Sequence, residues 1–146
     1  MTASDMHRPG PPSRLALADI LDHASHNGLY RYPDGHDIES AVHLHGRELT
    51  GKLAILDAVA EALAFPDYFG RNWDALEECL LDLAWRADGV AILIDEAQVP
   101  ESQAPSEWRE LLEILHDAAR YWKTAGRPFA VFLQGSHAAW PRIDVA

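Results

Sequence analysis

The chain has 146 residues, a length that suggests one domain with an additional element or tail. Its composition is 48% hydrophobic and 24% charged, the balance of a protein with a packed core. Twelve Lys and Arg against 23 Asp and Glu give a formal charge of -11, which argues against nucleic-acid binding and favours a cationic partner. Cys79, the single cysteine, cannot form an internal disulfide, and no apolar run is long enough to span a bilayer. Because the N-terminus also lacks the apolar segment of a secretory signal, we predict a cytoplasmic protein.

The N-terminal part of the chain is poor in regular patterns. Its first 13 residues are rich in Pro, Gly, Ser and His, a composition typical of disorder. Apolar residues at helical spacing make Leu15 to His26 a candidate short helix, and the turn-rich stretch after it holds a candidate short strand around Leu29. We therefore assign 1–37 to an N-terminal extension, partly disordered with one candidate helix, and 38–146 to the main domain.

The main domain alternates apolar runs with amphipathic segments. The expected strands are Ala41 to His45, Val90 to Ile94 and Phe129 to Gln134, and the expected helices are Thr50 to Ala64, a segment beginning at Asn72, and Ser106 to Ala125. The last two strands are continuously apolar, as in strands covered on both faces. Helical connections between such strands predict an α/β fold with a small parallel sheet packed with helices.

Two of these helices have predicted caps and core faces. Thr50 is the predicted N-cap of the first, with Leu53 among its inward residues. Ser106 is the predicted N-cap of the long helix, whose apolar stripe begins at Trp108 and ends at Trp122.

Motifs for catalysis or cofactor binding are weak in this sequence. It contains no phosphate-binding glycine loop, no H-E-x-x-H and no paired C-x-x-C. His43 and His45 form an H-x-H pair that a strand would place on one face, which is an arrangement of two metal ligands or a polar outer surface. A small hydrolase or metal-dependent enzyme using this pair is therefore one alternative. We predict no metal, no cofactor and no enzymatic activity.

The segment after Asn72 is an amphipathic helix with an unusual charge pattern. Between Asn72 and Trp85 it carries four carboxylates and no Lys or Arg. The predicted inward face carries Leu76, Cys79, Leu80 and Leu83, and the opposite face carries Asp74, Glu78, Leu81 and Trp85, flanked by Glu77 and Asp82. Acid pairs spaced four apart each cost a few tenths of a kcal/mol, about 0.2–0.5, in an isolated helix. The face is either merely solvated or a surface for a cationic partner, and an exposed Leu81 favours the binding surface.

The string "FPDYFGRNWDALEECLLDL" resembles the barstar family, intracellular inhibitors of the ribonuclease barnase. The match comprises a proline, an acid, two aromatics, Gly-x-Asn, an apolar residue, and Asp-Ala-Leu-x-acid-Cys-Leu, and the resemblance extends from Ser40 to Gly135. It implies a three-stranded parallel sheet packed with helices, and a binding protein rather than an enzyme. The implied partner is a basic ribonuclease or nuclease toxin, not a nucleic acid or a membrane.

By this resemblance the acidic helix and the loop before it enter the cationic active site of a ribonuclease, where carboxylates take the place of RNA phosphates. The implied partner-binding residues are Tyr68, Asn72, Trp73, Asp74, Glu77, Glu78 and Leu81, with Asp74 and Glu78 as the principal anions. The chain departs from the family inhibitor at Glu78, where that protein has the shorter Asp, and at Tyr121, where it has a further acid. Glu77 and Leu81 likewise replace an aromatic and a small polar residue. A barstar-like module that binds another cationic protein without inhibiting a ribonuclease is the second hypothesis.

Overall fold

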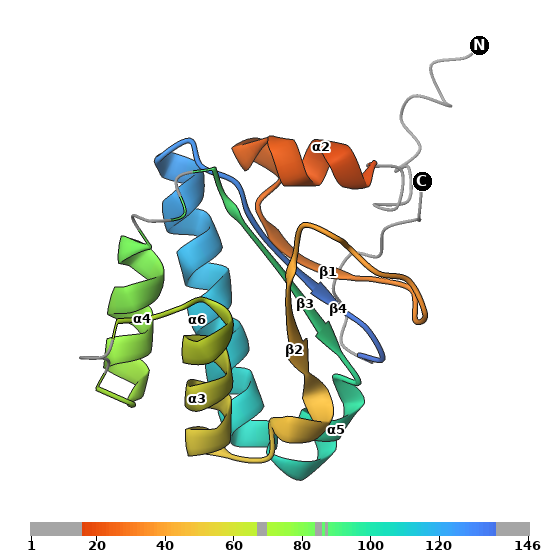
Figure 1. The fold of residues 1–146 in the computed structure, drawn as a ribbon, viewed down its shortest axis with the longest axis vertical. Helices are drawn as coiled ribbons and strands as arrows, with labels where there is room; N and C mark the ends of the chain where they lie inside the picture. The colour runs from red at the N-terminus through yellow and green to blue at the C-terminus, as the bar shows by residue number, and fades with distance from the viewer. Residues whose placement is uncertain (1–15, 67–69, 84–85, 87, 137–146) are drawn as a thin grey trace, which may run out of the picture.

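The computed structural model describes residues 16–66, 70–83, 86 and 88–136 of the chain (Figure 1). Its elements are α2 (Leu17–Asp22), η2 (Ala24–His26), β1 (Gly28–Arg31), β2 (Val42–His45), η3 (Gly46–Glu48), α3 (Lys52–Ala62), α4 (Trp73–Asp82), β3 (Val90–Asp95), α5 (Gln98–Gln103), α6 (Pro105–Thr124) and β4 (Phe129–Leu133). None of the helices in these described ranges is both long and apolar enough to cross a membrane.

The sheet has four parallel strands in the order β1-β4-β3-β2. The predicted α/β class with a parallel sheet is therefore confirmed, but the expected count of three strands is wrong. The additional strand is β1, which pairs with β4 from Gly28 opposite Ala130 to Arg31 opposite Leu133. It satisfies the backbone donors and acceptors that β4 would otherwise leave open at the sheet edge.

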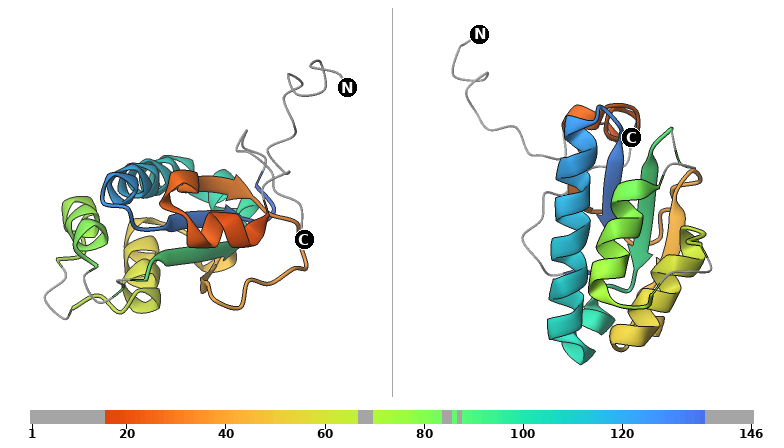
Figure 2. Two further views of the ribbon diagram at one scale, coloured as in Figure 1. Left: turned by 90° about the horizontal axis from the view of Figure 1, so that it is seen from above. Right: turned by 90° about the vertical axis from the view of Figure 1, so that its left-hand side faces the viewer.

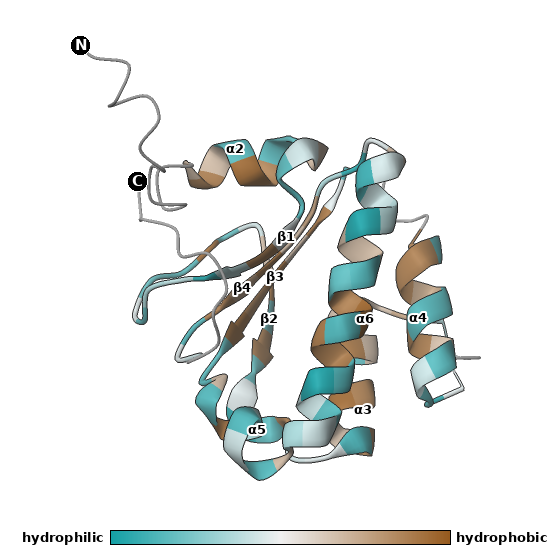
Figure 3. Cartoon of the chain, turned by 180° about the vertical axis from the view of Figure 1, so that it is seen from behind, coloured by the Kyte–Doolittle hydropathy of each residue, from teal (hydrophilic) through white to brown (hydrophobic). Residues whose placement is uncertain are grey.

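Helices α3 and α6 cover one face of the sheet, and α4 lies outside them (Figures 1 and 2). The main core fills the space between the sheet and these helices, and β3 and β4 are hydrophobic along their length (Figure 3). Every residue of β4 is buried, as its continuous apolar run predicts. Because α4 rests on α3 and α6 rather than on the sheet, one side of it faces outward along its length.

The other face of the sheet is covered by the segment preceding β2. There α2 and the β1–β2 connection enclose a second core in which Ile20, Tyr30 and Phe132 are buried. Tyr30 stacks on Phe132 with ring centroids 5.9 Å apart. The Asn27 side chain joins this segment to the rest: its Nδ2 donates to the carbonyls of Ala119 (3.1 Å) and Arg127 (2.9 Å), and its Oδ1 accepts from Phe129 N (2.8 Å). The segment 16–41 is thus an integral part of the fold.

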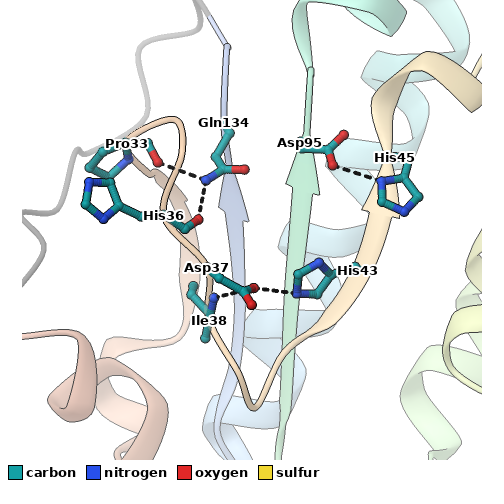
Figure 4. A network of polar contacts seen from close by, with 8 residues as sticks. All are labelled: Pro33, His36, Asp37, Ile38, His43, His45, Asp95 and Gln134. Carbon is teal, nitrogen blue, oxygen red and sulfur yellow. Dashed lines mark hydrogen bonds and ion pairs between the residues drawn. The ribbon is translucent and has the colours of Figure 1, made fainter.

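Polar contacts fix the connection between β1 and β2 across the end of the sheet (Figure 4). Gln134 is buried, and its Nε2 donates to the carbonyls of Pro33 (2.8 Å) and His36 (2.6 Å). Asp37 Oδ1 accepts from Ile38 N and lies 2.8 Å from His43 Nε2. Ile38 is thereby positioned in the second core.

The helices differ from prediction mainly at their N-termini. α3 begins at Lys52 after Gly51, not after Thr50, and no side chain caps it. Its buried face runs through Ile55, Leu56 and Val59, so Leu53 lies on the outer side and is 52% exposed. In α6 the predicted stripe is buried, but the helix begins at Pro105, so Ser106 lies inside the first turn. A proline suits that position because its missing N–H would have no helical partner.

Candidate functional site

The acidic helix α4 begins at Trp73, with Asn72 as its N-cap, as predicted. The Asn72 Oδ1 accepts a hydrogen bond from Ala75 N at 2.8 Å, which satisfies one of the unpaired donors in the first turn. Asp74 lies in that first turn, where the helix dipole favours a negative charge. The start of the helix is thus well defined by its own sequence.

Arg71, the residue before the cap, holds this start against α3. Its Nε and Nη2 donate to Oδ1 and Oδ2 of Asp57, both at 2.8 Å, a two-pronged ion pair. The hydrogen bond to Asp57, and then its charge, raise the pKa of Arg71. Arg71 also adopts a positive φ of 53°, a conformation that costs energy in a residue with a side chain. The pair therefore stabilises a strained turn and occupies the guanidinium that directly precedes the acidic helix.

The inward face of α4 packs mostly as expected. Leu76, Leu80 and Leu83 are fully buried in the main core. Cys79 is only half-buried, and burial, followed by the charges of Asp82 and Glu78, raises the pKa of its thiol. A protonated thiol is a poor nucleophile, so this environment opposes a catalytic role for the cysteine.

The outward face of α4 is acidic and exposed. Its exposed carboxylates are those of Asp74, Glu77, Glu78 and Asp82. Leu81, which we expected to be exposed among them, is half-buried against the main core, because the helix also leans on its neighbours at that position. Trp73 is likewise half-buried against the core. The face therefore has a nearly uniform negative charge with an apolar margin rather than an apolar centre.

The C-terminal end of α4 is capped by residues from the end of α6 and the turn that follows it. The indole Nε1 of Trp122 donates to Leu80 O at 3.0 Å. Arg127 Nη2 donates to the carbonyls of Leu83 (3.1 Å) and Arg86 (2.9 Å), and its guanidinium lies 3.9 Å above the Trp122 ring. A cation is favoured at a helix C-terminus, and α4 has no basic residue in its last turn. Another part of the chain supplies that charge on the inner side, and the exposed charged residues of α4 are all acidic.

A hollow of about 470 Å³ lies between the first turn of α3 and the start of α4. Its described lining residues are Lys52, Asn72, Trp73, Asp74, Ala75 and Glu78. Four residues of the predicted partner-binding set therefore share one depression. Of the remaining predicted residues, Glu77 lies on the exposed face and Leu81 lies at its margin. Tyr68 is outside the described residues, and so are Phe69 and Trp85.

The two histidines of β2 pair with carboxylates rather than with each other (Figure 4). His43 contacts Asp37, and His45 Nδ1 lies 2.9 Å from Asp95 Oδ2. Among the residues that the structure describes, no group of three or more His, Cys, Asp or Glu is arranged to hold a metal ion. The first contact ties the β1–β2 connection to β2 and the second ties β2 to β3, a structural use of these histidines.

Three basic residues that sequence reasoning did not select shape this surface: Lys52, Arg71 and Arg127. Arg71 is the only base within the matched string, which is a usable signal in the sequence. Lys52 and Arg127 come from distant positions and need the fold to be seen. Tyr121, which replaces a family acid, is 52% exposed and directly precedes the capping Trp122.

Comparison with protein families matches residues 39–134 to the family described as Barstar (barnase inhibitor). The chain belongs to the barstar family. The matched part contains β2, β3 and β4, whereas β1 precedes it, so the additional strand lies outside the barstar region. No curated protein matches the chain significantly.

Proposed function

We propose that this barstar-family protein inhibits a basic ribonuclease or nuclease toxin by covering its active site with the outer face of α4 and the loop before it. The observation that carries the proposal is the unmixed acidic face, whose own base, Arg71, is occupied by Asp57. Such a surface attracts a cationic cleft and speeds association. In this role the protein is an immunity protein or antitoxin, with Tyr68, Asn72 and Trp73 as neighbouring contacts.

The carboxylates of Asp74 and Glu78 act by binding, through their position and charge, and catalyse no reaction. Asp74 and Glu78 are one helical turn apart on the exposed side and line the same hollow. Arg and Lys side chains that normally hold phosphate oxygens also bind carboxylates, Arg often through two parallel hydrogen bonds. Two adjacent carboxylates can therefore occupy two phosphate-binding positions and exclude RNA.

The proposal includes a cytoplasmic location, where an inhibitor protects the cell from a nuclease it meets there. The lone half-buried Cys79 is consistent with this, since the chain cannot form an internal disulfide. Glu78 and Tyr121 favour a basic nuclease other than barnase as the target. The longer Glu78 side chain places its charge further out than an Asp, and the exposed ring of Tyr121 offers an apolar contact instead of a charge. Both features select a partner with its own spacing of cations.

The test is inhibition of RNA cleavage by barnase and by a panel of other basic ribonucleases. We expect wild-type protein to inhibit at least one of them. The double variant Asp74→Ala, Glu78→Ala should lose at least about 100-fold in affinity, because each lost hydrogen bond to a charged group contributes about 1.5–3 kcal/mol.

The matched control is Glu110→Ala, Glu113→Ala, which removes the same charge from exposed positions of α6. This variant should lose only the small steering effect of net charge. Equal losses in both double variants would show that α4 is not the binding surface. Binding without inhibition would instead support the second hypothesis, a regulatory module.

A further inference from the structure

The hollow beside the acidic helix is not uniformly negative. Its wall on α3 carries Lys52, and its wall on α4 carries Asp74 and Glu78. The side chain of Lys52 is exposed and makes no hydrogen bond or ion pair with any other residue in the described part of the chain. The cation therefore lies across an open depression from two carboxylates without pairing with either.

Two other bases near α4, Arg71 and Arg127, are used differently. Arg71 is held by both oxygens of Asp57, and Arg127 lies beneath the end of α4 on the Trp122 ring. Both are thus neutralised or turned inward. Lys52 alone among the three keeps its charge directed at the proposed binding surface.

Lys52 does not stabilise α3. Lys52 is the first residue of the helix, an end at which the helix dipole disfavours a positive charge. Lys52 is itself exposed, as is Leu53 beside it, so the lysine is not part of the core. The position thus carries a small cost to the fold and a charge that opposes a purely cationic partner.

A partner seated in this hollow would remove water from Lys52. An ammonium group that loses water without gaining an acceptor weakens a complex, whereas one that meets a carboxylate strengthens it and fixes the orientation of the two proteins. We propose that Lys52 is a specificity residue: it pairs with a carboxylate that the partner carries beside its cationic groups, so the surface selects a partner with a mixed rather than a purely basic site. This inference rests on the proposed function and names the charge pattern of its target.

The proposal fits the chemistry of the target class. Enzymes that cleave RNA by proton transfer need a general base near their phosphate-binding cations, and Asp or Glu can fill this role. A carboxylate at that place would face the α3 wall of the hollow when the cations face Asp74 and Glu78. Lys52 would then favour binding to a nuclease active site over binding to a basic patch that has no carboxylate.

The test measures the binding of barnase, and of each ribonuclease inhibited in the panel above, to Lys52→Met and to Lys123→Met. Lys123 is the matched control, because it is exposed near the end of α6 and its loss changes net charge equally. We expect Lys52→Met to raise Kd about tenfold, mainly through faster dissociation, and Lys123→Met to stay within about threefold of wild type. Lys52→Arg keeps the charge and should restore most of the affinity.

A double-mutant cycle then identifies the pair. Each Asp or Glu in the ribonuclease cleft is changed to its amide, and one of them should show no further loss when combined with Lys52→Met. Binding of Lys52→Met that equals or exceeds that of Lys123→Met would overturn the proposal and show that Lys52 only repels the partner. Failure of wild type to bind any ribonuclease would refute the proposed function itself, a result distinct from a loss confined to Lys52.

Discussion

Removal of the Arg127 guanidinium should loosen the C-terminal end of the acidic helix. In Arg127→Met two hydrogen bonds to the carbonyls of Leu83 and Arg86 are lost, together with the contact to the Trp122 ring. Hydrogen bonds to charged donors contribute about 1.5–3 kcal/mol and an exposed cation–π contact about 0.5–1 kcal/mol. Because one nitrogen makes both bonds and the side chain is half-exposed, we expect about 2–4 kcal/mol in the free energy of unfolding.

Thermal unfolding followed by circular dichroism measures this loss. For a chain of this size each kcal/mol lowers Tm by about 3–4 °C, so Arg127→Met should melt about 6–16 °C below wild type. Arg127→Lys should fall between the two, because an ammonium group keeps the charge but cannot stack and reach both carbonyls in the same way. The control is Arg120→Met, an exposed position on α6 whose side chain makes no hydrogen bond or ion pair with any of the described residues. If Arg127→Met and Arg120→Met melted at the same temperature, the capping role would be refuted.

Three further predictions concern other contacts. Asn27→Ala removes three hydrogen bonds between the N-terminal segment and the rest of the fold, and should lower the free energy of unfolding in urea by about 2–4 kcal/mol; a loss below about 1 kcal/mol would show that the segment docks independently of Asn27. Alkylation of Cys79 by iodoacetamide should be slower than that of a free thiol at neutral pH and should reach its midpoint at higher pH, since burial raises the thiol pKa; a midpoint at or below that of a free thiol would contradict this. Because the pKa of the Cys79 thiol is raised in the folded state, its contribution to the free energy of unfolding is present below the pKa of the unfolded chain. It is lost as pH rises through the pKa of the folded state. The losses of stability in Asp57→Ala and Arg71→Ala should be non-additive, so that the double variant loses less than the sum of the two single variants, and purely additive losses would show that the ion pair does not hold the turn.

Local patterns sufficed for the elements whose information lies within one stretch of sequence. The apolar runs of β3 and β4, the stripe of α6 and the Asn72 cap were all predicted correctly, because each depends on residues a few positions apart. The acidic face followed in the same way from the spacing of its carboxylates.

The features missed depend on distant residues. The candidate short strand around Leu29 is confirmed as β1, but its place in the sheet was missed, because it pairs with the open edge of β4, which comes near the end of the chain. Periodicity alone predicts that Leu81 faces outward, yet α4 packs on two helices and so buries more than one stripe of its surface. The charges of Lys52 and Arg127 reach the acidic helix only after the chain has folded.

The central claim is that the outer face of α4 is where a basic ribonuclease binds. The most direct measurement is an NMR titration of the wild-type chain with a catalytically inactive ribonuclease from the panel, in which the backbone amide shifts report the contact surface without any change to this protein. We predict the largest shifts in residues 70–83 and at Lys52, with little change in α2 and β1. Shifts concentrated at the His43–His45 edge or over α2, with α4 unchanged, would contradict the account.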